Sequence, residues 1–325
     1  MMTPLKMWCF LPLAVLLLLF ISPTETKVVQ GMAQCEGFLL NKPPQVPGIL
    51  EKGQIRKQNQ YKLICQTYEN KTRFVTLYDT KNKIPVFSAY KYKGDDKTGR
   101  PQDEIWKIEP QLENMNGDKN MEDCDAKKTY TNQAGNNDYK NNKDYNRGHL
   151  FPSSFGFDKT DKISTFTLTN IVPQAISFNS GSWKKMENYI KCILENYCEN
   201  NNNNPEGYVV TGAKANEENK TLNNRVNIPS MLWSAFCCYS QQNKTWIAGA
   251  FMGDNVPDKS KTKYLQMETL EKLYNELSTG NAKFEAFPES RCPLNHTPED
   301  ENMKKKCEDP LHLFTDMFYK DEEAL

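Results

Sequence analysis

Four polar residues within one stretch of the chain have types and positions that could support chemistry: His149, Asn170, Asn179 and Glu187. The imidazole of a histidine titrates near neutral pH and therefore suits proton transfer. Packing alone would favour apolar side chains at such positions, because a buried amide or carboxylate needs a partner. We expect the four side chains to converge from a strand or loop, a second strand, a turn and a helix.

Asn170 follows an alternating pattern. From Thr165 to Ile171 the period of two places Phe166, Leu168 and Asn170 on one face of an expected strand. An amide therefore occupies a position that should face the core, where it needs hydrogen-bond partners.

The following stretch predicts a helix that carries Glu187. Its apolar residues recur at helical spacing and gather on one side: Trp183, Met186, Ile190, Ile193 and Leu194. Glu187 falls inside this stripe, so its carboxylate must be paired, hydrogen-bonded or close to a cation. Gly181, with Ser180 or Ser182, suits the start of the helix, where unpaired amide groups and the helix dipole favour a phosphate.

These residues resemble the catalytic segment of the DNA/RNA non-specific endonuclease family, the Serratia-nuclease type with a ββα-metal active site. The matching segments are Asn146-Arg147-Gly148-His149, Asn170 to Gln174 and Asn179 to Trp183. The resemblance extends over residues 60 to 290, through strand-like segments at 73–79, 85–90, 207–212 and 229–233. It implies an α+β fold with a central antiparallel β-sheet, a ββα-metal nuclease element at 144–195 and disulfide bonds.

The resemblance also implies a role for each catalytic residue. His149 would be the general base that takes a proton from water, and Arg147 would contact the phosphate. Asn179 would hold one Mg²⁺ or Mn²⁺ ion directly, and Glu187 would order the waters around the ion. Such a site contacts the nucleic-acid backbone and not the base edges, so weak sequence preference follows.

Three further residues, Asn146, Asn170 and Gln174, would bind or position the substrate. The family usually has Asp at the place of Asn146. An amide keeps the shape of that side chain but loses the charge that would hold Arg147. This departure predicts weakened catalysis.

The implied function is a sequence-non-specific endonuclease that hydrolyses phosphodiester bonds of DNA or RNA. The alternative is a catalytically weakened, extracellular binding or interaction protein on the same fold, which Asn146 favours. A hydrolase of other phosphodiesters would use similar chemistry. The presence of Arg147, His149, Asn179 and Glu187 together favours an enzyme.

The charge balance limits how nucleic acid could be attracted. The 325 residues include 41 Lys and Arg and 41 Asp and Glu, for a formal net charge of zero. A neutral chain has no global field to attract phosphates, so a local basic patch must do so. Most of the polar stretch 91–148 suggests a long surface loop, and a loop that runs into the catalytic motif could also gate substrate. Before Asn146, no single residue in it has a sequence signal for a site role.

The N-terminus predicts export. Lys6 precedes an apolar run at 7–21, which is shorter than the ~20 residues that span a membrane and is followed by Ser22-Pro23. We interpret 1–26 as a signal peptide, with a membrane anchor as the alternative, and expect a secreted, extracellular protein without stable membrane association. An N-terminal segment at 27–59, the endonuclease domain at 60–292 and a C-terminal tail at 293–325 would follow.

In an exported protein the cysteines predict disulfide bonds. Cys237 and Cys238 are neighbours in an expected strand, so their side chains point to opposite faces and should bond to different partners. We expect Cys198 and Cys292 to pair with these two, in either order.

The remaining cysteines are less constrained. We expect Cys35 to pair with Cys65, while Cys124, Cys192 and Cys307 stay unassigned. Nine of the ten cysteines follow the expected signal peptide, and an odd number leaves at least one thiol unpaired.

Four N-glycosylation sequons begin at Asn70, Asn219, Asn243 and Asn295. They predict a glycoprotein and should mark surface loops. Neither His296, which lies in a sequon, nor His312, which lies in the tail, is expected to act in catalysis.

Overall fold

The computed structural model describes residues 28–29, 31, 35, 37–298 and 301–307. The expected signal peptide at 1–26 and His312 lie outside this range. Within the described part of the chain, no helix has the length and apolar character needed to cross a membrane.

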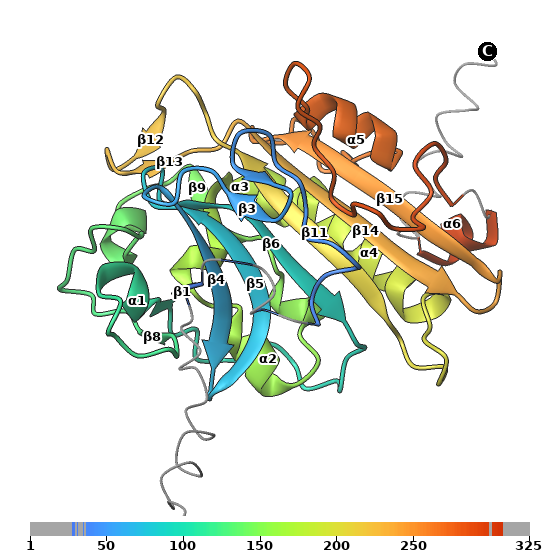
Figure 1. The fold of residues 1–325 in the computed structure, drawn as a ribbon, viewed down its shortest axis with the longest axis horizontal. Helices are drawn as coiled ribbons and strands as arrows, with labels where there is room; N and C mark the ends of the chain where they lie inside the picture. The colour runs from blue at the N-terminus through green and yellow to red at the C-terminus, as the bar shows by residue number, and fades with distance from the viewer. Residues whose placement is uncertain (1–27, 30, 32–34, 36, 299–300, 308–325) are drawn as a thin grey trace, which may run out of the picture.

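A seven-stranded antiparallel sheet forms the centre of the described structure (Figure 1). Its order is β1 (Val28–Val29), β4 (Tyr61–Tyr68), β5 (Lys71–Asp79), β6 (Ile84–Tyr92), β11 (Gly207–Lys214), β14 (Met231–Ser240) and β15 (Thr245–Asp254). Each neighbouring pair runs antiparallel. The expected α+β class with a central antiparallel sheet is therefore confirmed.

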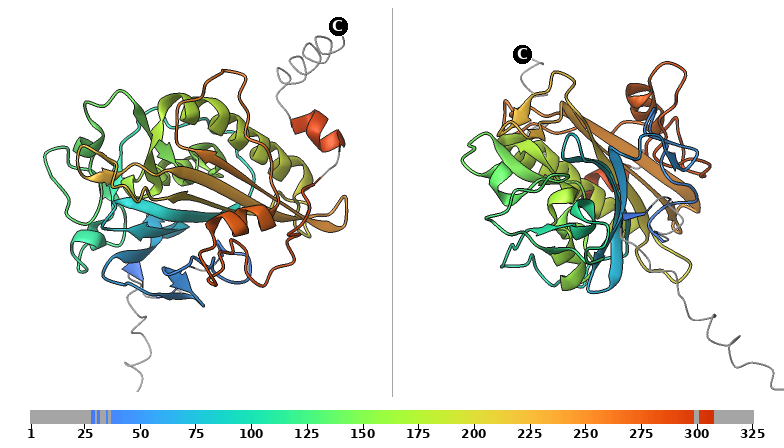
Figure 2. Two further views of the ribbon diagram at one scale, coloured as in Figure 1. Left: turned by 90° about the horizontal axis from the view of Figure 1, so that it is seen from above. Right: turned by 60° about the vertical axis from the view of Figure 1, so that its left-hand side comes forward.

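Both faces of the sheet are covered, so its strands are apolar on both sides. In β14, Phe236 and Cys238 belong to one core cluster, whereas Ala235 and Cys237 belong to the other. Helix α4 (Lys184–Tyr197) lies in the layer that covers the first face. The N-terminal segment and α5 (Leu270–Leu277) cover the opposite face (Figure 2).

Shorter elements connect these layers. They are β2 (Leu50–Glu51), β3 (Gln54–Ile55), β7 (Lys107–Ile108), α1 (Pro110–Glu113), β8 (Glu122–Asp123), η2 (Asn136–Tyr139), η3 (Ser153–Phe155), α2 (Lys159–Ser164), β12 (Thr221–Leu222), β13 (Val226–Asn227) and α6 (Glu301–Cys307). Helix α5 begins at Leu270, because the side chain of Thr269 accepts a hydrogen bond from the backbone N–H of Lys272 and caps the helix there.

The site-bearing layer is built from a two-stranded ribbon and a helix. Strand β9 (Tyr145–His149) pairs antiparallel with β10 (Ile171–Ala175), and the chain continues through α3 (Ile176–Phe178) and η5 (Asn179–Trp183) into α4. The arrangement is the expected ββα element. All five apolar residues of the expected helical stripe are buried: Trp183, Met186, Ile190, Ile193 and Leu194.

The expected strand at 165–171 is wrong. Its last residues form a 3₁₀ turn, η4 (Leu168–Asn170), and the strand starts only at Ile171. Alternation suggested one-sided burial, but Thr167 and Thr169 are as buried as their apolar neighbours, and their hydroxyls bond the carboxylate of Glu109. The alternation predicted that the threonine side faces solvent. Instead, a buried polar group from a distant segment satisfies the threonine hydroxyls.

The described cysteines form four disulfide bonds. They are Cys35–Cys65, Cys192–Cys307, Cys198–Cys238 and Cys237–Cys292. The expected Cys35–Cys65 pair and the separate partners of Cys237 and Cys238 are confirmed. Among the previously unassigned cysteines, Cys192 bonds to Cys307 and Cys124 keeps a free thiol.

All four sequon asparagines are exposed: Asn70, Asn219, Asn243 and Asn295. Asn70 lies in the turn between β4 and β5, and Asn243 lies in the turn between β14 and β15. The expectation that these sequons mark surface loops is confirmed.

Candidate active site

A pocket of about 580 Å³ brings together four of the expected site residues: Arg147, His149, Asn179 and Glu187. They come from β9, from the turn η5 and from helix α4. The remaining walls come from the segment 95–100, the loop after β9 and residues of α2 and α4. Of the four side chains expected to converge, those of His149, Asn179 and Glu187 do so, whereas Asn170, expected on a second strand, does not line this pocket.

Alternation in β9 turns Arg147 and His149 to the same side of the ribbon. Gly148 between them is buried and faces Gln174, whose side chain fills the space that a side chain at 148 would need: a Cβ there would lie 2.2 Å from Oε1 of Gln174. Only glycine therefore fits at position 148 with the ribbon in this packing.

His149 is half-buried in an aromatic surround. Its ring centroid lies 5.3 Å from that of Trp106 and 5.1 Å from that of Phe166. Its Nε2 atom is enclosed and has no hydrogen-bond partner among the described residues. Burial, together with the nearby charge of Arg100, lowers the pKa of His149 to about 3. The imidazole is therefore neutral at physiological pH.

The loop after His149 is fixed against the central sheet. Phe151 stacks on Tyr90 of β6 with ring centroids 4.1 Å apart, and Phe155 meets the same tyrosine edge-on at 5.9 Å. Asn170 completes this attachment, because its side-chain amide bonds both the backbone N–H and the carbonyl oxygen of Phe151, each at 3.0 Å.

Asn170 is fully buried and its amide is satisfied. Besides the Phe151 contacts, its Oδ1 accepts from the Ser88 hydroxyl and its Nδ2 donates to the Thr165 carbonyl. Gln174 is also fully buried, and its side-chain amide has no partner within the described residues. Neither residue lines the pocket, so each can act on the site only by positioning the ribbon.

Arg147 is held by an aromatic and amide environment. Its guanidinium lies over the rings of Trp106, at 5.0 Å, and Tyr139, at 5.4 Å, and Nη2 donates to Oδ1 of Asn136 at 3.2 Å. Asn146 is exposed on the other side of β9 and does not line the pocket. The expectation that a charge at position 146 would hold Arg147 is therefore wrong, because adjacent strand residues face opposite sides.

Asn179 begins the turn η5, directly before α4. Its side chain is half-buried at the pocket, and its amide group makes no hydrogen bond within the described residues. An amide oxygen without a protein partner can bind a cation or the substrate.

The expected phosphate site at the Gly181 turn is wrong, because a carboxylate of the protein fills it. Asp258 accepts hydrogen bonds from the backbone N–H of Ser182, at 2.8 Å, and from its hydroxyl, at 2.9 Å. A Cβ at Gly181 would lie 2.6 Å from the same carboxylate. Asp258 thus takes the anion position and fixes the turn that carries Asn179.

Glu187 projects from the first turn of α4 into the pocket. Burial raises the pKa of its carboxyl to about 8, and the indole N–H of Trp183 and the charges of Lys184 and Arg100 only partly offset this. Nε1 of Trp183 makes no hydrogen bond of standard geometry, so the carboxyl lacks the close partner that its position requires.

Basic residues dominate the described pocket lining. Six are basic, namely Lys97, Arg100, Arg147, Lys162, Lys184 and Lys191, against two acidic ones, Asp95 and Glu187. The expected local basic patch on a neutral chain is present here. The stretch 91–148 was expected to lie mostly on the surface with no site residue of its own before Asn146, but residues 95–100 line the pocket and bring Arg100 close to His149.

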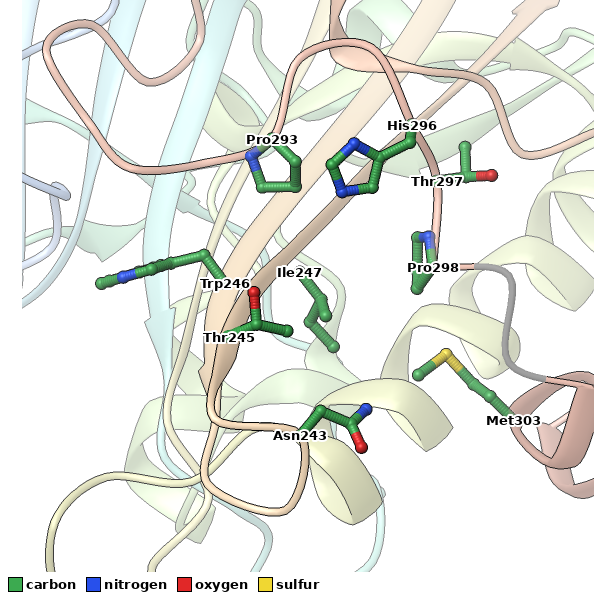
Figure 3. Close-up of a pocket in the computed structure, with 9 residues that line it drawn as sticks. All are labelled: Asn243, Thr245, Trp246, Ile247, Pro293, His296, Thr297, Pro298 and Met303. Atoms are coloured by element: carbon green, nitrogen blue, oxygen red, sulfur yellow. The ribbon is translucent and has the colours of Figure 1, made fainter.

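The other described histidine, His296, belongs elsewhere. It lines a mostly apolar pocket of about 300 Å³ with Ile247, Pro293, Pro298 and Met303 (Figure 3). It takes no part in the pocket around His149, as expected from its position in a sequon.

The pocket residues fit a hard divalent cation held mainly by water. No cluster of three or more His, Cys, Asp or Glu residues within the described chain could hold a metal ion. Mg²⁺ needs no such cluster, because it keeps several waters and takes few protein oxygen ligands. The unpartnered amide of Asn179 and the unpaired carboxyl of Glu187 line one pocket and meet this requirement.

Glu187 should make the protein less stable as the pH rises from about 4.5 to about 8 in the presence of a chelator. The folded state keeps the Glu187 proton up to about pH 8, whereas an unfolded chain releases it near the ordinary glutamate pKa of 4.5. The unfolded state binds fewer protons in this window, so the free energy of unfolding falls with rising pH.

Glu187→Gln should therefore raise the melting temperature at pH 8 by a few degrees, or about 1–2 kcal/mol for a carboxyl that is only half-buried, and change it little at pH 4.5. Thermal unfolding of both proteins at the two pH values in EDTA checks this. The same difference at both pH values would contradict it.

The chain is similar in sequence to proteins of known families. The chain is 29% identical over 214 residues to endonuclease domain-containing 1 protein of Homo sapiens, covering 64% of this chain and 39% of the relative. The Mus musculus protein is 27% identical over 249 residues, covering 75% of this chain and 46% of the relative. The chain thus spans less than half the length of either relative.

Two other matches are more distant or shorter. The mitochondrial nuclease EXOG of Xenopus laevis is 29% identical over 157 residues, covering 43% of this chain and 42% of the relative. The solved EndoG/EndoGI complex matches with a TM-score of 0.44 at 17% identity, over 62% of this chain and 80% of that one.

The family itself is shown by a match over most of the described chain. Residues 53–287 match the profile of the DNA/RNA non-specific endonucleases. This range includes the central sheet from β4 to β15 and the complete ββα element with its pocket. The chain belongs to the DNA/RNA non-specific endonuclease family.

Proposed function

We propose that this protein is a secreted, sequence-non-specific endonuclease that hydrolyses phosphodiester bonds of DNA or RNA and depends on a divalent cation. The observation that carries the proposal is the shared pocket of Arg147, His149, Asn179 and Glu187. It joins a neutral imidazole, oxygen ligands and an excess of positive charge, which are the groups that phosphodiester hydrolysis needs.

Two arginines of the pocket suit the phosphate. A guanidinium presents planar donors that match phosphate oxygens, and its charge persists at all physiological pH values. Arg147 is held by the rings of Trp106 and Tyr139, and its Nε has no partner among the described residues. Arg100 lies over the ring of Phe166, at 5.0 Å. Both are thus oriented before a substrate arrives.

His149 is the proposed general base. Its Nε2 is enclosed, so Nδ1 is the ring nitrogen that can reach a water in the pocket. Its lowered pKa keeps the ring neutral and ready to accept a proton. A bound phosphate brings negative charge beside it, which favours the protonated imidazole and so raises its pKa toward the range in which a base works well.

Asn179 and Glu187 are the proposed residues for the cation, with the amide oxygen of Asn179 as the direct ligand. When bound, a divalent cation neutralises charge on the phosphate and on the leaving oxygen. Glu187 accepts hydrogen bonds from surrounding waters once its carboxyl has lost its proton. Because burial raises its pKa to about 8, we expect cation affinity to increase with pH up to that value.

The competing interpretation, a weakened nuclease that only binds partners, drew on Asn146. That residue is exposed and lies outside the pocket, and Arg147 is held by other groups. Export is supported by the four disulfide bonds and by the exposed sequons.

Purified full-length protein should degrade both supercoiled plasmid and a structured RNA in millimolar Mg²⁺ and should degrade neither in EDTA. Agarose gels over time give the result, and the bis(4-nitrophenyl) phosphate rate tests a hydrolase of small phosphodiesters. Oxidised, folded protein that cleaves neither nucleic acid with Mg²⁺ or Mn²⁺ would refute the proposed function. Equal cleavage with and without EDTA would refute the metal dependence.

A further inference from the structure

The segment from Asp95 to Arg100 carries a pocket arginine without any regular secondary structure of its own. We propose that Lys162 and Lys191 are positioning residues, which hold Asp95 between two helices and thereby place Arg100 beside His149. The expected effect of these lysines on the cleavage rate rests on the proposed nuclease function. Their expected effect on the order of residues 95–100 rests on the contacts alone.

Lys162 of α2 is the first holding point. Its side chain is 4% exposed, and Nζ donates to Oδ1 of Asp95 at 2.7 Å, to the carbonyl of Thr98 at 2.9 Å and to the hydroxyl of Thr98 at 3.3 Å. The three donors of the ammonium group are therefore all directed at the segment 95–98. A lysine this deeply buried is stable only with such partners.

Lys191 of α4 is the second holding point. Its Nζ donates to Oδ2 of Asp95 at 2.7 Å, one helical turn after Glu187. Burial alone would raise the pKa of Asp95, but the hydrogen bonds from the two lysines keep that pKa well below its usual range. The carboxylate of Asp95 thus ties α2 and α4 to the same turn.

The backbone around this carboxylate is fixed as well. The N–H of Lys97 donates to Oδ1 of Asp95 at 2.9 Å, and the N–H of Asp96 donates to the carbonyl of Phe157 at 3.0 Å. Phe157 follows Gly156 in the loop before α2. This loop can approach Lys162 closely because residue 156 is glycine: a Cβ there would lie 2.8 Å from the backbone nitrogen of Lys162.

The side chain of Arg100 itself makes only weaker contacts. Its Nε donates to Glu104 at 2.7 Å in an exposed pair, and its guanidinium lies over Phe166. An exposed pair of this kind contributes little to order. The clamp at Asp95, defined as Lys162 and Lys191 with that carboxylate, is therefore the main restraint on where Arg100 sits.

A double-mutant cycle separates positioning from direct substrate contact. Lys162→Met should lower kcat/KM for plasmid cleavage about 10-fold, and Arg100→Ala should lower it at least as much. In the double variant we expect no further loss beyond that of Arg100→Ala, because Lys162 acts through Arg100. Lys185→Met removes a lysine of the same helix as Lys191 but outside the pocket, and should leave the rate unchanged.

Hydrogen–deuterium exchange tests the clamp without relying on activity. Amide exchange at residues 95–100 should increase in Lys162→Met and Lys191→Met and stay unchanged in Lys185→Met. Should Lys162→Met fail to fold, Lys191→Met enters the same cycle, since its side chain is 19% exposed and less confined. The proposal would be overturned if the double variant lost kcat/KM by the product of the two single losses. Unchanged amide exchange at residues 95–100 in the lysine variant that folds would overturn it as well. A wild type that cleaves nothing would refute the proposed function and leave the exchange result to decide on the clamp.

Discussion

His149→Ala should reduce the rate of nucleic-acid cleavage by about 10²–10⁴-fold, the usual contribution of a general base. The reason is the environment of the ring. Burial and Arg100 keep the imidazole neutral, and because Nε2 is enclosed, Nδ1 is the atom available to the attacking water. Removing the ring should not disturb cation binding, because Asn179 approaches the pocket from the turn before α4.

The measurement is an initial rate with saturating Mg²⁺, together with the half-maximal Mg²⁺ concentration and the melting temperature. His296→Ala is the matched control, because His296 is the other described histidine and lines a separate apolar pocket. Cleavage by His149→Ala at the wild-type rate would rule out this base. A large drop in melting temperature would show that the aromatic surround of Trp106 and Phe166 depends on the ring, and His149→Gln would then replace it as the test.

Much of the fold could be predicted because its signals are local. Runs such as 73–79, 85–90 and 207–212 have strand composition, and all three became neighbouring strands of the central sheet. Adjacent cysteines in one strand required different partners, and Cys237 and Cys238 do bond across opposite faces. In each case the backbone geometry alone dictates the outcome.

The ββα element was predicted in place but not in detail. Its helix followed from apolar spacing, whereas the strand was expected too early, because buried Thr167 and Thr169 imitate a solvent-facing row. Their partner Glu109 lies 58 residues from Thr167 in sequence, and no local pattern reveals such a contact. A period of two indicates alternating polarity, and only the tertiary structure decides whether water or protein satisfies the polar side.

The contributions of Arg100 and Asp258 to the site could not be predicted from the sequence. Arg100 lies in a polar segment without helix or strand. Its approach to the pocket depends on the ion pair between Asp95 and Lys162, which are 67 residues apart in sequence. Asp258 fills the anion position before α4 from a loop that is also distant in sequence, 76 residues after Ser182. Both contacts join loops to helices, so neither leaves a periodic signal.

Asn179→Ala should raise the Mg²⁺ concentration needed for half-maximal cleavage by at least about 10-fold, since loss of even an outer partner of a metal site costs about 10–100-fold in affinity. The amide of Asn179 has no hydrogen bond to lose within the described residues, so its removal should leave the melting temperature in EDTA unchanged. This separates it from Asn170, whose amide makes four buried bonds and whose loss should destabilise the fold.

Rates are measured against Mg²⁺ concentration for wild type, Asn179→Ala and Asn201→Ala, an exposed amide in the loop after α4 that should behave as wild type. Isothermal titration of Mn²⁺ into each protein without substrate gives cation affinity independently of cleavage. A slower Asn179→Ala enzyme with unchanged cation affinity would place this amide on the substrate and not on the cation. Glu187 would then be the remaining described pocket residue with an unpaired carboxyl to hold the ion, and its pKa of about 8 would make binding weaken steeply below that pH.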